Sequence, residues 1–182
     1  VNRHNFIQWK EIDLRQMRDD NDLGHWGLIH DWRYLADTAA ARLKTLVPEA
    51  DIRTAQAFAF AGYGYVFAGE FMCESPINVG SEVLTSNDLT ALAIPRFQEA
   101  ISQATAAKAA GQSASTADNL INLAKVGLGR AYLQVGQKTE AIYAVTGVPA
   151  SYVWMMRYST NSGGENNLFR AATTGSNRYF GV

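Results

Sequence analysis

Two carboxylates at helical spacing, Glu70 and Glu74, come closest in this chain to a pair of acid and base residues. A glycoside hydrolase needs two positioned carboxylates, one acting as an acid and the other as a base or nucleophile. In an exposed helix, two like charges four residues apart repel by only roughly 0.2–0.5 kcal/mol. A solvated helix end beside a loop is therefore the preferred interpretation. We expect no catalytic residues and no enzymatic activity.

Other patterns that would hold a metal or a cofactor are incomplete. None of the three histidines, His4, His25 and His30, is four residues from another, and no HExxH motif occurs. The glycines of the run 62–69 lack the GxGxxG spacing of a dinucleotide-binding loop. Cys73 is the only cysteine, so the chain has neither an internal disulfide nor a thiolate cluster. The sequence predicts no metal site and no cofactor.

Aromatic and amide side chains are the more suggestive candidates for binding a ligand. Trp154, Tyr158 and Asn161 lie close together in the sequence, and Asn78 lies in a polar segment further upstream. Flat apolar faces beside amide donors and acceptors suit a sugar ring or another neutral polar ligand. For each aromatic taken singly, packing against the helices is the alternative. The candidate contact loops are residues 74–88 and 154–167.

The composition is that of a soluble globular protein with little net charge. The chain has 182 residues, of which 47% are hydrophobic and 18% charged, and its formal net charge is −1. Its basic residues are scattered from Arg3 to Arg178, whereas a nucleic-acid site needs a concentrated positive field. No nucleic-acid partner is expected. The sequence also lacks an apolar run long enough to span a bilayer.

Hydrophobic periodicity predicts a series of helices in residues 26–47, 51–72, 96–110, 119–135 and 137–145. Pro48, Pro95 and Gly136 lie at expected helix ends, and Asp51 is an expected N-cap. The helix over 51–72 is apolar nearly all round, which predicts a central position. The apolar face predicted for the first helix comprises Trp26, Ile29, Trp32, Leu35, Ala36, Ala39, Leu43 and Leu46.

The remaining segments are expected to be irregular. Residues 74–88 are predicted to form a loop that ends in a helix cap at Ser86-Asn87-Asp88, and residues 111–116 a linker. Beyond residue 158, Gly, Ser, Thr and Asn predominate, which is typical of turns and loops. We therefore expect a helical scaffold over residues 1–158 and a loop segment over 159–182.

A spaced motif recurs within the helices and predicts their packing. Gly62, Tyr65 and Gly69 reappear 67 residues later as Gly129, Tyr132 and Gly136. Small residues beside an aromatic are typical of tetratricopeptide repeats, which pair antiparallel helices. Ala141 follows Tyr132 by 9 residues as the small residue of a second helix, whereas Ala100 follows Tyr65 by 35, so about 26 residues interrupt the first unit. The predicted fold is all-α, a tetratricopeptide-like array with long loop insertions, and the alternative is a helical bundle in which the motif recurs by chance.

Three segments carry a family resemblance: AFAGYGYVFAGEFMC, RFQEAISQA, and AKVGLGRAYLQVGQKTEAIYAVTGVPASYVWMMRYS. In order and spacing they resemble the SusD/RagB family of outer-membrane nutrient-binding lipoproteins over residues 26–159. The resemblance implies an interrupted α-solenoid, a SusC-like TonB-dependent barrel as partner, and an oligosaccharide or peptide ligand. It also implies surface attachment through an N-terminal lipid anchor.

Departures from that family leave a second hypothesis open. The chain lacks the family's lipid-modified N-terminal cysteine, and it stops short of the usual family length, so we expect residues 159–182 to begin a larger ligand-binding part. The stretch 69–73 reads Gly-Glu-Phe-Met-Cys where the family commonly has Gly-Asp-Pro. The alternative is a general tetratricopeptide adaptor that holds a partner's peptide or helix on its surface.

Overall fold

The computed structural model describes residues 25–47, 49–78 and 80–155, which are mostly helical. Residues 24–152 form one unit, and the description below concerns that unit alone. The elements follow in the order α2 (His25–Leu46), α3 (Ile52–Phe71), β1 (Glu74–Pro76), β2 (Val83–Thr85), α4 (Ser86–Ala91), α5 (Ala93–Ala109), α6 (Ala114–Gln134) and α7 (Lys138–Ala144). The all-α class is confirmed, with one small two-stranded sheet added.

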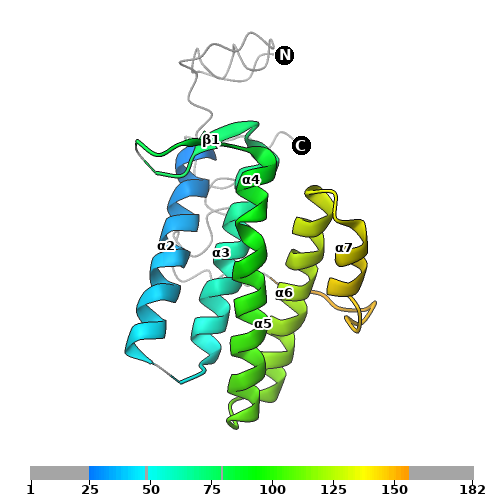
Figure 1. Ribbon diagram of the computed structural model, residues 1–182. Coiled ribbons are helices and arrows are strands. Elements are labelled where there is room, and N and C mark those ends of the chain that lie inside the picture. The colour runs from blue at the N-terminus through cyan, green and yellow to red at the C-terminus, as the bar shows by residue number, and fades with distance from the viewer. Residues whose placement is uncertain (1–24, 48, 79, 156–182) are drawn as a thin grey trace, which may run out of the picture. The chain divides into compact units, whose positions relative to one another are not determined.

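The long helices lie side by side in chain order, and consecutive ones run in opposite directions (Figure 1). α2 packs on α3, α3 on α5, α5 on α6, and α6 on α7. α3 also contacts α4 and α6, so it lies at the centre of the unit. The central position predicted for the helix over 51–72 is confirmed. Its alanines and glycines permit this crowding because they bring neighbouring backbones close together.

Local sequence signals set several helix ends where they were expected. The Asp51 carboxylate accepts a hydrogen bond from the backbone N–H of Arg53 at 2.7 Å, capping α3. Side-chain hydrogen bonds from Arg53 lower the pKa of Asp51 to about 2. Pro95 is the third residue of α5, where its missing N–H breaks no helical bond. Gly136 follows α6 with a φ of +82°, a conformation that glycine adopts without strain.

Two helices start earlier than predicted. α5 begins at Ala93 rather than at residue 96, and α6 begins at Ala114 rather than at 119. The Ser113 hydroxyl caps α6 by accepting a bond from the Thr116 N–H. Residues 111–116, which were predicted to form a linker, therefore include a helix cap and the start of the helix that follows it.

The predicted loop over residues 74–88 contains regular structure instead. β1 and β2 pair in antiparallel register, with Glu74 opposite Thr85 and Pro76 opposite Val83. α4 starts directly after β2, and its N-cap is Thr85, not the predicted group 86–88. Thr85 and Asp88 form a reciprocal capping box, in which each side chain accepts a bond from the other's backbone N–H. We call residues 74–85 the hairpin segment, and the capping box fixes its junction with α4.

The buried face of α2 differs from the apolar face predicted for it. Ile29 is buried, but Trp32, Leu35 and Leu46 have exposed fractions of 38%, 66% and 77%. The buried residues next to Ile29 are polar: His30 and Arg33. Within this unit α2 packs mainly on α3, so only the side chains that face α3 and the hairpin segment are covered. The apolar stripe and the covered stripe of α2 are two different faces.

Among the described residues, Phe97 of α5 is the largest fully buried side chain, and glycines make room for it. A Cβ atom added at Gly62 of α3 would lie 2.7 Å from the Phe97 ring, and one at Gly127 of α6 only 2.4 Å. The Tyr63 ring meets Phe97 edge-on with centroids 5.1 Å apart. The contact among α3, α5 and α6 is therefore centred on the Phe97 ring.

The two copies of the recurrent motif do not occupy equivalent environments. Gly69 lies inside α3, where an added Cβ would meet the Ser86 carbonyl and the Thr90 hydroxyl, whereas Gly136 lies in a turn. Gly129 faces Val145 just past the end of α7.

The tyrosines of the two copies also differ in burial. Tyr65 is buried, while Tyr132 is half-buried and its hydroxyl accepts a bond from Gln98. Ala100 is buried in α5. Ala141 is only partly covered, like the other residues of α7, none of which is buried.

Replacing Gly127 with alanine should lower the free energy of unfolding by about 1–3 kcal/mol, the usual cost of overpacking a core. Gly27 provides a matched control, because it is also helical but has nothing within 4 Å of an added Cβ. Gly27→Ala should raise stability by up to about 1 kcal/mol through helix propensity. Chemical denaturation measures both variants. In a Phe97→Leu background the Gly127→Ala penalty should shrink, and an unchanged penalty would contradict the assigned contact.

Candidate functional site

One polar stripe of α2 meets the hairpin segment and joins it to the helices. Trp26, His30, Arg33 and Asp37 are spaced four, three and four residues apart, which places them on one face of the helix. We call these four residues the docking stripe. His30 and Arg33 are only 7% and 5% exposed. Buried polar side chains are costly unless hydrogen-bonded, so the partners of this stripe decide its role.

The first half of the docking stripe holds β1. Ser75 is 1% exposed, and its hydroxyl accepts a hydrogen bond from the Trp26 indole N–H at 2.8 Å. The same hydroxyl lies 3.1 Å from Nε2 of His30. The Trp26 and His30 rings pack with their centroids 4.5 Å apart. Residues about 45 positions apart in the sequence are thus brought into a small buried cluster.

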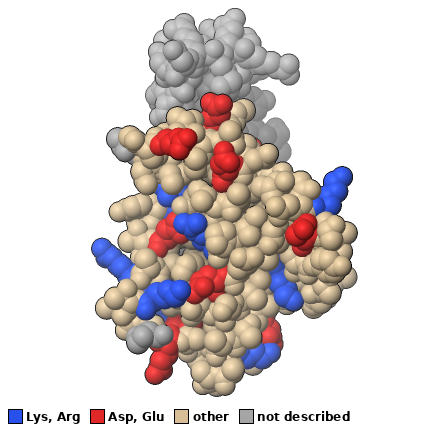
Figure 2. All heavy atoms as spheres, viewed as in Figure 1, with Lys and Arg blue, Asp and Glu red and all other residues tan. Residues whose placement is uncertain are grey.

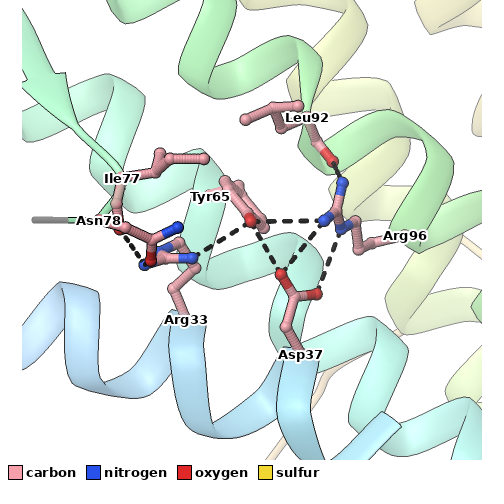
Figure 3. Close-up of polar contacts among 7 residues, drawn as sticks. All are labelled: Arg33, Asp37, Tyr65, Ile77, Asn78, Leu92 and Arg96. Carbon is pink, nitrogen blue, oxygen red and sulfur yellow. Dashed lines mark hydrogen bonds and ion pairs between the residues drawn. The ribbon is translucent and has the colours of Figure 1, made fainter. Parts of the chain in front are cut away.

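Arg33 holds the segment that follows β1. Its guanidinium donates to the carbonyl of Ile77 and to the side-chain oxygen of Asn78 at 3.4 Å (Figure 3). It also donates to the Tyr65 hydroxyl at 3.3 Å and lies 5.4 Å from the centre of that ring. A single buried arginine therefore links α2, α3 and the start of the hairpin loop.

Asp37 completes the connection to α5. It accepts a hydrogen bond from the Tyr65 hydroxyl at 2.8 Å and two bonds at 3.2 Å from Arg96, which form a bidentate ion pair. Arg96 also donates to the Leu92 carbonyl and lies over the Tyr65 ring, 4.6 Å from its centroid. Figure 3 shows the phenol between the two guanidinium groups, with Asp37 below it. Bidentate geometry makes this the most directional ion pair of the cluster.

The chemistry of this cluster is that of a clamp. Burial first, and then the hydrogen bond to Asp37, raise the pKa of Tyr65, so its phenol stays protonated near neutral pH. Among the contacts described for the stripe, no carboxylate pairs with Arg33. The phenol and the two guanidinium groups act here as hydrogen-bond donors. They position the backbone of the hairpin segment on α2 and α3.

An open hollow of about 550 Å³ lies beside Asp37 and Arg96, and Phe58, Lys44 and Glu99 are among its other lining residues. Lys44 pairs with Glu99 at 2.7 Å and lies 5.7 Å from the centre of the Phe58 ring. On the face drawn in Figure 2, acidic and basic side chains are interspersed and form no field of one sign. The hollow has the size of a small-ligand site, but its charges already pair with one another.

The structure describes two of the four predicted ligand-binding residues, Asn78 and Trp154. Asn78 is exposed in the hairpin loop, where its side chain accepts from Arg33 and its backbone N–H donates to Ser81. Trp154 is half-buried and lies beyond the unit formed by residues 24–152. Tyr158 and Asn161 lie outside the described residues. Glu70, half of the carboxylate pair, forms an ion pair with Arg130, and Glu74 is exposed in β1.

Sequence reasoning missed the docking stripe. The sequence does contain a pattern that indicates this stripe: positions 26, 30, 33 and 37 have helical spacing, and their side chains are an indole, an imidazole, a guanidinium and a carboxylate. It was overlooked because the apolar stripe on the same helix has the same period.

The comparisons with known proteins add no relatives. No model of a known protein family matches the chain, and no curated protein or solved structure matches it. In the part of the chain that the structure describes, no helix is both long and apolar enough to cross a membrane. In the same part, His, Cys, Asp and Glu side chains form no group of three that could hold a metal ion.

Proposed function

We propose that this chain is a non-enzymatic binding scaffold, the nutrient-binding component of an outer-membrane TonB-dependent uptake complex of SusD type. Its ligand is an oligosaccharide or a peptide, and its partner is a SusC-like barrel. The location at the outer membrane, through a lipid anchor, follows from the same resemblance. The observation that carries the proposal is a structured hairpin inserted between two paired helices and clamped by buried polar groups.

The helix order supports a tetratricopeptide-like arrangement. α3 with α5 and α6 with α7 are the two proposed helical pairs, and α3 packs on α6, as the first helices of successive repeats do. Gly62 and Gly129 lie at close approaches within these pairs, against Phe97 and Val145 respectively. The segment between α3 and α5 carries the insertion inferred from the spacing of Tyr65 and Ala100.

The clamped hairpin supports a binding role for the inserted segment. Ile77, Asn78, Gly80 and Ser81 lie between its two strands, with Asn78 and Gly80 exposed, while the flanking Ser75 is buried. Binding loops on a rigid scaffold lose little conformational entropy when they engage a ligand. An exposed amide at such a tip suits hydroxyl or peptide groups.

Purification of the tagged protein from native membranes in mild detergent tests the partner. We expect a large TonB-dependent β-barrel to co-purify in stoichiometric amounts. Calorimetric titration with a panel of oligosaccharides and peptides then tests the ligand, and Asn78→Ala should weaken binding by up to about tenfold, the loss of one hydrogen bond. Asn119→Ala, on the exposed face of α6, is the control and should leave affinity unchanged. A protein that recovers no barrel and binds no member of the panel would exclude the proposal.

A second function, a general tetratricopeptide adaptor, is favoured by the exposed apolar residues near the end of the array. Leu133, Ile142 and Tyr143 are 61%, 69% and 73% exposed. Exposed apolar surface of this kind marks protein contacts when it is contiguous. The same purification separates the two roles, because an adaptor would recover a partner other than a barrel, and Ile142→Asp would abolish that recovery.

A further inference from the structure

His30 lies where the hairpin segment meets α2, and its ring nitrogens are not equally satisfied. Nε2 is 3.1 Å from the Ser75 hydroxyl. Nδ1 is buried, and no group described here offers it a hydrogen bond. Together with Trp26, these residues form the contact between the docking stripe and β1.

Counting the hydrogen bonds assigns the tautomer of His30. A serine hydroxyl has one proton to donate and two lone pairs to accept with. The Ser75 hydroxyl donates to the Pro76 carbonyl at 3.1 Å and accepts from the Trp26 indole. One lone pair is left for His30, so Nε2 carries the proton and donates it. Nδ1 then holds a bare lone pair, which costs less to bury than an unpaired N–H donor.

A second proton on His30 would upset this balance. It would create a buried N–H donor at Nδ1 without an acceptor, one helical turn from the positive charge of Arg33. Burial, and next the charge of Arg33, lower the pKa of His30, while Asp31 raises it to a smaller extent. Among the described contacts, the hairpin segment meets His30 through the uncharged Ser75 hydroxyl, and Glu74 is exposed.

We propose that His30 is a pH-sensitive latch whose protonation releases the hairpin segment from α2 while the helices around Phe97 stay folded. With the hairpin open, the ring is solvated and regains an ordinary proton affinity. The closed form is thus fully favoured above pH 6.5, the usual value for histidine, and becomes progressively less favoured below it. The consequence for ligand binding at Asn78 rests on the proposed function, whereas the latch itself does not.

Amide hydrogen exchange of the full chain between pH 7.5 and 5 tests the latch. After correction for intrinsic exchange, protection of residues 74–85 should fall below pH 6.5, by up to about tenfold per pH unit. Amides of α5 and α6 should keep their protection over the same range. His30→Gln keeps a donor near Ser75 but does not titrate, so its hairpin protection should not depend on pH.

His4→Gln removes a different histidine and should retain the wild-type pH dependence. The proposal is overturned if His30→Gln follows the wild-type profile, if the wild type shows no pH dependence, or if α5 and α6 lose protection in parallel with the hairpin. Should His30→Gln fail to fold, titration of the His30 ring of the wild type by NMR decides the question. A measured pKa at or above 6.5 would overturn the latch, and one below it supports it. None of these measurements requires the ligand, so a failed latch is distinguishable from a failed ligand assignment.

Discussion

A Phe97→Ala variant should lose about 3–5 kcal/mol of its free energy of unfolding. Phe97 is 0% exposed and lies between Gly62 of α3 and Gly127 of α6. Gly62 and Gly127 have no side chains that could move into the space, so truncation leaves a cavity among three helices. Urea denaturation followed by circular dichroism measures the loss, because a unit of this size is expected to unfold in one transition.

Ile142→Ala is the matched large-to-small control. Ile142 is 69% exposed on α7, so its truncation should change stability by no more than about 0.5 kcal/mol. Phe97→Leu should fall between the two variants because it retains part of the buried volume. A loss below about 1 kcal/mol for Phe97→Ala would contradict the central role assigned to this ring.

The positions of the helices could largely be predicted, because single residues determine several of the helix ends. Asp51 caps α3, Pro95 lies in the first turn of α5, and Gly136 ends α6. These effects act within one turn of chain and need no tertiary partner. The starts of α5 and α6 were predicted too late in the sequence, because the first turns of these helices consist of residues that occur equally in loops.

The covered face of α2 could not be predicted from periodicity. Helical spacing shows which residues share a face, but a neighbouring element decides which face is buried. Trp32 and Leu35 satisfy the apolar pattern and remain exposed, while His30 and Arg33 are covered by the hairpin segment. Their burial depends on partners about 45 residues away.

Neither the hairpin segment nor the cluster around Tyr65 could be predicted from local sequence patterns. Each strand has only three residues, too few to show an alternating pattern. The motif predicts a packing role for the Tyr65 ring, yet the Tyr65 hydroxyl joins Asp37 to two arginines. The role of that oxygen appears only when α2 and α5 are both in place.

Asp37→Asn should produce the second large loss of stability, about 2–3 kcal/mol, somewhat below the 3–5 kcal/mol typical of fully buried pairs. The Asp37 and Arg96 side chains are 24% and 26% exposed, so solvent screens their interaction only in part. The amide nearly matches the carboxylate in shape but removes its charge, which leaves the Arg96 guanidinium without its neutralising anion. One amide nitrogen also replaces an oxygen that accepts from Arg96.

Asp118→Asn applies the same substitution to an ion pair in solvent. Asp118 contacts Lys108 at 2.6 Å, but the side chains of Asp118 and Lys108 are 53% and 43% exposed, and exposed pairs contribute about 0–1 kcal/mol. Parallel urea denaturation of the two variants isolates the effect of burial, since the chemical change is identical. Equal losses would mean that the cluster around Tyr65 is no more than a surface ion pair. We expect a larger loss for Asp37→Asn, together with reduced exchange protection of residues 74–85. This result would show that the cluster around Tyr65 stabilises the hairpin segment. Arg33 connects the two, because it donates to the Tyr65 hydroxyl, which is bonded to Asp37, and to the Ile77 carbonyl of the hairpin segment.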